Sequence, residues 1–215
     1  MISKAALRRI LEALKARYPD ALCSLEYEKD YELLFAVRLS AQCTDARVNQ
    51  VTPALYARFP TLESFAQADP AEVGRYIHSC GFYNGKARDI VACAQKLLQD
   101  FGGKVPGTME ELTSLPGVGR KTANLILGDI YHQPAYVCDT HCIRITGRLG
   151  ITDGSKDPLQ VERQLRQVLP PAESSNFCHR MVLFGRDICT ARAPKCTQCP
   201  LQKDCAARKE ADRTP

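Results

Sequence analysis

The chain has 215 residues, which is enough for one large domain or two small ones. Apolar residues make up 45% and charged residues 25%, a composition that excludes a disordered chain and is typical of a globular protein. Lysine and arginine exceed aspartate and glutamate by 29 to 24, a mild excess that fits a polyanionic partner without proving one. No stretch approaches the roughly 20 unbroken apolar residues of a membrane span. We therefore expect a cytoplasmic protein without membrane contact, whose eleven cysteines are not explained by disulfides.

Apolar residues recur at helical spacing from one end of the chain to the other, and alternating runs of β-branched residues are almost absent. This pattern predicts an all-α fold. The expected helices span residues 4–18, 30–40, 45–58, 62–68, 70–79, 85–101, 109–114, 120–131, 140–148, 158–169 and 174–188. Thr52 and Pro53 look like a fresh cap and a first-turn proline, so we expect an interruption there. The connections are short, and none resembles a flexible linker.

Residues 112–127 read LTSLPGVGRKTANLIL and predict two helical stretches joined by a tight turn from Leu115 to Gly119. The turn's glycines permit a positive φ and a close approach of the backbone, and the helix that starts near Arg120 directs N–H groups outward. The segment therefore predicts a helix-hairpin-helix that grips a phosphate. A nucleotide-binding P-loop is excluded, because Arg120 and Leu115 stand where its glycines are required and no apolar strand precedes them.

Lys121 lies in the first turn of the second hairpin helix, beside Arg120. The helix dipole and the neighbouring cation both oppose a positive charge on this lysine, and a neutral lysine is a usable nucleophile. A solvated lysine that touches phosphate is the more common case, so a nucleophile needs a partner carboxylate. Asp139, in the segment YVCDTHC, is the candidate partner. Aspartate is also a favoured N-cap residue, and the two roles are compatible.

The most specific pattern is a C-x6-C-x2-C-x5-C array near the C-terminus, formed by Cys189, Cys196, Cys199 and Cys205. Four thiolates so spaced can hold either zinc or an iron–sulfur cluster. Only Cys196 and Cys199 form the short knuckle that zinc modules use in pairs, so the spacing favours iron–sulfur and leaves zinc open. The loop after Cys189 would present Arg192 and Lys195 to DNA phosphates. Alternatively, the only role of the cluster is to attach the C-terminal segment to the rest of the protein.

The remaining seven cysteines lie singly on helical patterns, and we expect them to be small buried hydrophobes. They are Cys23, Cys43, Cys80, Cys93, Cys138, Cys142 and Cys178. Cys138, His141 and Cys142 look like a second metal site, but a helix start can hardly direct all three side chains inward.

The hairpin LPGVGRKTAN, the segment VCDTHC and the cysteine array, in this order, closely resemble endonuclease III, a family of the helix-hairpin-helix DNA glycosylase superfamily. The resemblance also covers LSAQCTDARVN (39–49) and CGFYNGKARDI (80–90). It implies two helical domains with a cleft between them, across which duplex DNA lies. A six-helix domain would span residues 23–133, and residues 1–22 with 134–215 would form a domain that holds a [4Fe–4S] cluster on the four cysteines.

The resemblance also implies an activity: removal of oxidised pyrimidines from duplex DNA, followed by cleavage 3′ to the abasic site by β-elimination through a lysine Schiff base. Lys121 matches the nucleophile and Asp139 the essential carboxylate. Gln42 would fill the gap left by a flipped nucleotide and Phe82 would wedge the duplex. The residues that match the phosphate grip are Pro116, Gly117, Val118, Gly119 and Arg120. We expect a monomer, associated with the nucleoid through DNA.

Three residues depart from the family pattern: Phe82 stands where leucine is expected, Phe184 where histidine is common, and Cys138 where a small or aliphatic residue is usual. They leave the preferred lesion and the opposite base open. An adenine or mismatch glycosylase is the nearest alternative, but it lacks the lysine that is present here as Lys121. A DNA-binding module without catalysis is the other alternative, and it has no need of a lysine–aspartate pair.

Overall fold

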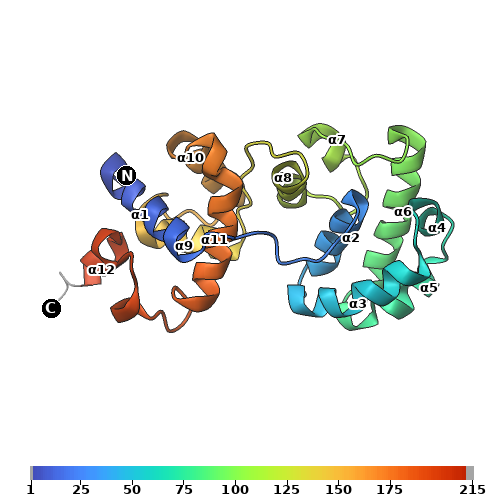
Figure 1. The fold of residues 1–215 in the computed structure, drawn as a ribbon, viewed down its shortest axis with the longest axis horizontal. Helices are drawn as coiled ribbons and strands as arrows, with labels where there is room; N and C mark the ends of the chain where they lie inside the picture. Colours follow the sequence, from blue (N-terminus) through green and yellow to red (C-terminus); the bar gives the residue numbers. More distant parts are fainter. Residues whose placement is uncertain (1, 212–215) are drawn as a thin grey trace. The chain divides into compact units, whose positions relative to one another are not determined.

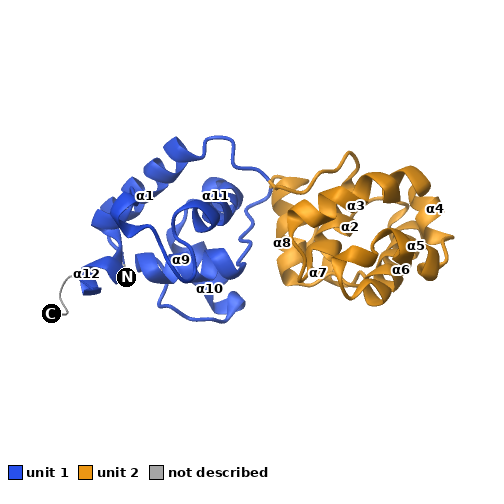
Figure 2. Cartoon of the chain, turned by 90° about the horizontal axis from the view of Figure 1, so that it is seen from below, with its two compact units in different colours: residues 1–22, 133–215 blue, residues 23–132 orange. Residues whose placement is uncertain are grey.

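The computed structural model describes residues 2–211, which form helices joined by loops, the longest over residues 18–29 and 130–139 (Figure 1). These residues contain no β-strand, which confirms the all-α prediction. The chain divides into two compact units, residues 23–132 (unit 2) and residues 1–22 with 133–215 (unit 1) (Figure 2). The end of the predicted cluster domain, residues 212–215, lies outside the described residues. None of the described helices is both long and apolar enough to cross a membrane.

Unit 2 is a continuous segment of helices. Its elements are α2 (Asp30–Ser40), α3 (Asp45–Arg58), α4 (Leu62–Ala66), α5 (Pro70–Tyr76), the 3-10 turn η1 (His78–Cys80), α6 (Tyr83–Phe101), α7 (Met109–Thr113) and α8 (Arg120–Asp129). Thr44, Thr61 and Asp69 cap the starts of α3, α4 and α5 by accepting backbone hydrogen bonds. Polar residues with short side chains at the expected helix starts therefore set these boundaries.

The predicted interruption at Thr52–Pro53 is wrong, because α3 runs unbroken with Pro53 inside it. Thr52 is buried and does not cap a new helix, and Val48 and Leu55 are buried as well. Core packing on both sides of the proline thus maintains the helix, although an interior proline costs about 3 kcal/mol. The predicted helix over residues 70–79 also ends early, at Tyr76, and is followed by η1.

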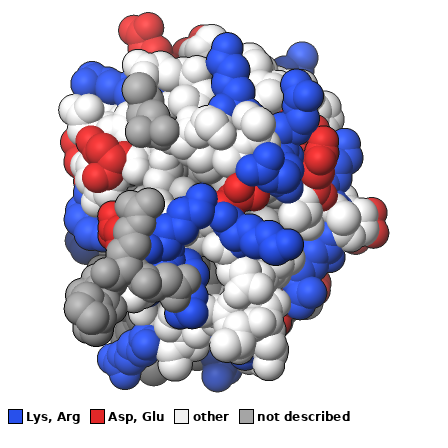
Figure 3. Space-filling view, turned by 90° about the vertical axis from the view of Figure 1, so that its left-hand side faces the viewer, with Lys and Arg blue, Asp and Glu red and all other residues white. Residues whose placement is uncertain are grey.

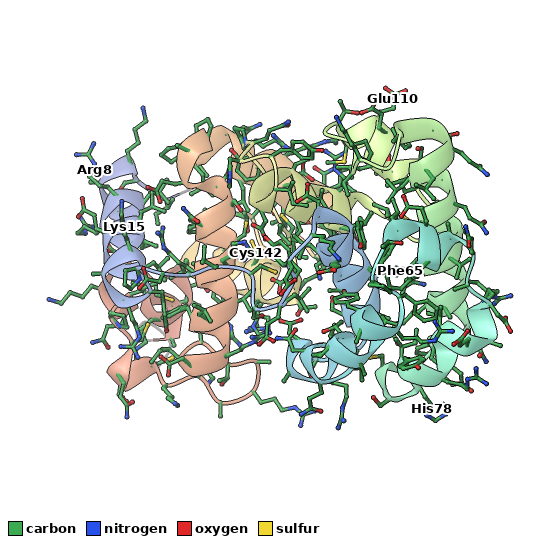
Figure 4. All side chains as sticks on the ribbon, turned by 45° about the vertical axis from the view of Figure 1, so that its right-hand side comes forward. Arg8, Lys15, Phe65, His78, Glu110 and Cys142 are labelled. Atoms are coloured by element: carbon green, nitrogen blue, oxygen red, sulfur yellow. The ribbon has the colours of Figure 1, made fainter. Side chains whose placement is uncertain are left out.

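The core of unit 2 is built around Phe65 of α4, which is fully buried (Figure 4). Its ring centroid lies 5.0 Å from that of Phe35 on α2 and 5.2 Å from that of Phe59. Both α4 and α5 pack against the long helix α6, as Figure 1 shows. This packing gives α2 and α6 fixed positions, from which the DNA-binding candidates of this unit project.

Unit 1 combines the two ends of the chain. Its elements are α1 (Lys4–Arg17), α9 (Thr140–Leu149), α10 (Pro158–Val168), η2 (Pro171–Glu173), α11 (Ser174–Asp187), η3 (Cys196–Gln198), η4 (Gln202–Asp204) and α12 (Ala206–Ala211). Helix α11 contacts both α1 and α9, and Cys142 of α9 lies in the interior (Figure 4). Arg17 of α1 forms a salt bridge with Asp187 of α11 at 2.6 Å, so polar contacts also join the two chain ends.

The end of unit 1 that carries α1 and α12 has more Lys and Arg than Asp and Glu on its surface (Figure 3). Arg8 and Lys15 of α1 are both exposed, and Figure 4 shows them projecting from that helix. Exposed cations of this kind attract polyanions at low salt.

Candidate active site and iron–sulfur site

The predicted hairpin is present in unit 2 as α7, a tight turn and α8. Val118 N–H donates to Leu115 O at 3.2 Å inside the turn, and Gly117 has a φ of +74°. Gly119 is the N-cap of α8 in an extended conformation. Gly117, Gly119 and Arg120 are exposed, whereas the Val118 side chain is buried. Val118 therefore supports the turn from inside, and its neighbours form the surface.

Lys121 is the second residue of α8 and is exposed. The hydrogen-bond ladder of α8 begins with Ala123 N–H, which donates to Gly119 O at 2.9 Å. The N–H groups of a first helical turn precede this ladder and point beyond the N-terminus of the helix, where an anion is stabilised. Lys121 therefore belongs to a helical turn whose N–H groups suit a phosphate.

Gln42 and Phe82, the two predicted inserting residues, share an unusual backbone. Both have positive φ values, +56° and +47°, and both side chains are exposed, Phe82 to 74%. Left-handed backbone at a residue other than glycine is costly and is concentrated at functional sites. The exposure and the strained conformation both support a role for these two residues outside the core.

The loops that carry Gln42 and Phe82 are tied together within unit 2. Lys86 of α6 is buried, and its Nζ donates to Leu39 O at 2.8 Å and to Cys80 O at 2.7 Å. Burial, together with the neighbouring Cys43 thiol, raises the pKa of Cys80 to about 11. One buried ammonium therefore joins the end of α2 to the turn that precedes α6.

Asp139 is the N-cap of α9 in unit 1, as one of its two predicted roles requires. Its Oδ1 accepts a hydrogen bond from Cys142 N–H at 2.7 Å, and the residue is partly exposed. Residues 135–138 before it are buried, so the carboxylate stands where a buried segment reaches the surface. Lys121 belongs to unit 2 and Asp139 to unit 1, so the pairing of these two side chains stays a prediction.

Three cysteine thiols interact with one another near the start of α9, those of Cys138, Cys142 and Cys178. Cys142 is hydrogen bonded to Cys138 and to Cys178, and these bonds, together with burial, raise the pKa of Cys142 well above its ordinary value. The thiol therefore stays neutral and adds no negative charge beside the carboxylate. The prediction of buried cysteines is correct for these three and for Cys80 and Cys93, and wrong for Cys23 and Cys43, which are partly exposed.

The four cysteines of the C-terminal array line one cavity of about 240 Å³. Leu149, Phe184 and Ile188 form part of its apolar wall. Arg148 Nη1 donates to Cys189 Sγ at 3.4 Å and to Thr190 O at 2.8 Å, so α9 holds the first ligand and the loop that follows it. These residues fit a thiolate-ligated cluster in an apolar pocket with a cation nearby.

The size of this cavity also bears on the choice between zinc and iron–sulfur. A tetrahedral zinc site draws its sulfurs to about 2.3 Å from one point, whereas a multi-iron cluster holds them farther apart. A cavity of about 240 Å³ lined by all four cysteines has room for the larger cofactor.

Arg192 and Lys195, in the loop between the first two cysteines, are exposed. Arg148 Nη2 donates to Ala191 O at 2.9 Å, and Lys195 N–H donates to Ile188 O at 3.0 Å, so both ends of the loop are held. Lys195 Nζ lies 4.0 Å from Asp187 Oδ1. These hydrogen bonds therefore hold the loop in place, and the loop carries two exposed cations.

Comparison with known proteins agrees with this geometry. Residues 35–171 match the HhH-GPD superfamily of base excision DNA repair proteins, and residues 189–205 match the iron–sulfur binding domain of endonuclease III. Endonuclease III of Synechocystis sp. is 44% identical over 203 residues, which are 94% of this chain and 92% of the relative. That of Bacillus subtilis is 37% identical, over 99% of this chain and 97% of the relative. This chain belongs to the endonuclease III family.

Solved structures extend the comparison to the fold. A trapped covalent intermediate of an endonuclease III with DNA aligns with a TM-score of 0.92 and 40% identity, covering 99% of this chain and all of the other. A thermostable thymine-DNA glycosylase aligns with a TM-score of 0.86 at 18% identity, which shows a shared fold only. As a member of the endonuclease III family, the protein is a base excision repair DNA glycosylase with an iron–sulfur cluster.

Several residues around the site were not singled out from the sequence. Lys86, Arg38 and Asp89 connect the DNA-binding candidates of unit 2, and Arg148 holds the cysteine loop in unit 1. Each acts on a partner more than five positions away along the chain. Helical periodicity alone carries no signal for such pairs.

Proposed function

We propose that the protein is a bifunctional DNA glycosylase and abasic-site lyase, which removes oxidised pyrimidines from duplex DNA and then cleaves the strand 3′ to the abasic site. The observation that carries this proposal is Lys121, an exposed amine in the first turn of α8, directly after a turn suited to phosphate. The covalent complex with DNA that has been trapped for a relative supports the same class of reaction.

A base inside the duplex is out of reach, so the nucleotide must first leave the stack. Extrusion costs a few kcal/mol and is easiest at a damaged pair. Gln42 and Phe82 would enter the vacated space, since both are exposed and stand on strained backbone that Lys86 supports. The flat ring of Phe82 would also stack on a neighbouring base.

Lys121 would act as the nucleophile. Its neutral amine attacks C1′ of the extruded nucleotide, the bond from C1′ to the base breaks, and the base leaves with the electron pair and takes up a proton. Loss of a proton from nitrogen and opening of the sugar ring then give a protonated Schiff base between Nζ and C1′.

The Schiff base makes the second reaction possible. The iminium acidifies the proton on C2′; after this proton leaves, the C3′–O bond breaks and the 3′ phosphate departs with the electron pair. Water then hydrolyses the imine and restores the lysine. One amine would therefore perform both base removal and strand cleavage.

Asp139 would stabilise positive charge that develops on the sugar and would accept a proton from the lysine. Its Oδ1 is fixed by Cys142 N–H, so the carboxylate is held in place before DNA binds. In this proposal each unit supplies one catalytic group, Lys121 from unit 2 and Asp139 from unit 1, and both act on the same nucleotide.

The hairpin turn from Pro116 to Arg120 would hold the DNA backbone through its N–H groups, with Val118 as internal support. Arg192 and Lys195 would contact phosphates from the second unit. We propose that the cluster is [4Fe–4S], held by Cys189, Cys196, Cys199 and Cys205, and that it fixes the loop bearing these two cations. The protein would act as a monomer on DNA of the nucleoid.

The proposal is tested on a duplex with one thymine glycol, by separate measurement of base release and strand cleavage. We expect both products from the wild type and neither from Lys121→Ala. Base release by the wild type without strand cleavage would reject the lyase reaction, and DNA binding without either product would reject catalysis on this lesion.

A further inference from the structure

The back of the hairpin turn rests on two side chains from other helices. A Cβ atom added to Gly117 would lie 2.8 Å from Arg38 Nε and 2.9 Å from Asp89 Cβ, closer than real Cβ contacts. Arg38 belongs to α2 and Asp89 to α6. The backbone of Gly117 therefore lies directly against this pair, which explains the need for glycine beyond its positive φ.

Arg38 and Asp89 form a close ion pair. Arg38 Nε and Nη2 lie 2.7 Å and 2.6 Å from the same oxygen, Oδ2 of Asp89. The two side chains are 27% and 31% exposed, and a pair so accessible to water stabilises a fold little. The position of the pair matters more than its energy, because Asp89 holds the Arg38 guanidinium against the hairpin turn at Gly117.

This ion pair joins the elements next to three DNA-binding candidates, which are Gln42, Phe82 and the hairpin turn. Arg38 lies in the last turn of α2, shortly before Gln42, and Asp89 lies on α6, which begins directly after Phe82. Lys86, one turn before Asp89 on the same helix, holds Leu39 O and Cys80 O. The Lys86 hydrogen bonds and the Arg38–Asp89 ion pair therefore both connect the end of α2 to the start of α6. The contact with Gly117 connects these two helices to the hairpin.

We propose that Arg38 and Asp89 are a positioning pair that keeps the hairpin turn in register with Gln42 and Phe82. This inference rests on the proposed function. It implies that the phosphate-binding hairpin turn and the inserted side chains act on the same nucleotide. A shift of the turn by about 1 Å would separate these two actions and weaken productive binding. The pair itself touches neither the base nor the reacting atoms.

A purely electrostatic role makes the opposite prediction for Asp89. DNA phosphates repel a carboxylate, so removing its charge in Asp89→Asn would strengthen binding if only charge mattered. A positioning role predicts weaker binding, because the neutral amide holds Arg38 less firmly. The sign of this one change distinguishes the two roles, and asparagine preserves the shape of the side chain.

The experiment measures the dissociation constant for a duplex with a stable abasic-site analogue, at several salt concentrations, for Arg38→Met, Asp89→Asn and the double variant. We expect binding to weaken about tenfold in each single variant and no further in the double variant, because the two residues act as one unit. At saturating natural abasic DNA, we expect the single-turnover rate to stay within about twofold of wild type.

Arg58 and Glu72 provide the matched control. They form an ion pair of similar length in the same unit, at 2.7 Å, and Arg58 is 50% exposed. Arg58→Met and Glu72→Gln should leave the dissociation constant unchanged. Thermal unfolding of every variant reports folding, and Asp89→Asn carries the test if Arg38→Met does not fold.

Tighter or unchanged binding by Asp89→Asn would overturn the inference, as would equal weakening in the control pair. A fall of about one in the salt slope for Arg38→Met would also overturn it, since that identifies a direct phosphate contact. Failure of the proposed chemistry is separate: it appears as wild-type protein that binds the duplex but forms no covalent adduct with natural abasic DNA under borohydride.

Discussion

Asp139 Oδ1 accepts a hydrogen bond from Cys142 N–H at 2.7 Å, so the candidate catalytic carboxylate is also the cap of α9. Asparagine caps a helix as well as aspartate, whereas alanine in its place costs about 1 kcal/mol. We predict that Asp139→Asn keeps wild-type stability and loses at least about 100-fold in base excision. Urea unfolding and single-turnover base release measure the two effects.

The companion variant is Asp139→Ala, which should lose both stability and activity. If Asp139→Asn excised bases at the wild-type rate, helix capping would be the only role of Asp139.

Gly185 of α11 allows α9 to approach closely. A Cβ at this position would overlap His141 Nδ1 and lie 3.0 Å from Arg144 Nη2. We predict that Gly185→Ala lowers the free energy of unfolding by about 1–3 kcal/mol, because the His141 and Arg144 side chains must move out of their packed positions. Gly85→Ala in α6 is the control, since nothing lies within 4 Å of the added methyl group. Equal stability of the two variants in urea would contradict this packing.

The cysteine array predicts a defined metal content. Purified protein should contain about four irons and four sulfides per chain and absorb visible light. Cys199→Ser should lose most of this absorption, and its segment 189–205 should become sensitive to protease, because cluster ligation ties the loop at four points. Cys93→Ala, in the other unit, should retain the cluster. One zinc per chain and no iron would identify a zinc site instead.

Burial raises the pKa of the Cys93 thiol from 9.0 to about 12. Between these two values the unfolded chain loses this proton and the folded protein keeps it, so stability falls as pH rises through the window. We predict that wild type loses about 1 kcal/mol more than Cys93→Ala between pH 7 and pH 9.5. Urea unfolding at both pH values measures this difference; equal losses would show that the thiol ionises freely.

The sequence predicts local features of the fold well. The helix starts expected at residues 45 and 70, the glycines of the hairpin and the helix start after Asp139 agree with the structure, because short-range backbone geometry requires particular residue types there. The break expected at Pro53 does not occur, because buried residues on both sides of it hold α3 together. Tertiary packing overrides local propensity there.

Long-range pairs of the site are not visible in the same way. Arg38 and Asp89 are far apart in the sequence, and either residue alone looks like an ordinary surface charge on a helix. Cysteine spacing alone leaves zinc and iron–sulfur open for the same reason. The spacing fixes the order of the ligands along the chain, whereas the cavity that they line also includes residues of α9 and α11.

The central claim is that Lys121 forms a covalent bond with DNA, and borohydride trapping tests it most directly. Wild type, Lys121→Ala and Arg58→Met would each be mixed with a duplex that carries an oxidised pyrimidine and reduced at once. We predict a protein–DNA adduct for wild type and for Arg58→Met, and none for Lys121→Ala. An adduct of undiminished yield in Lys121→Ala, or base release by wild type without any adduct, would contradict the role of this lysine.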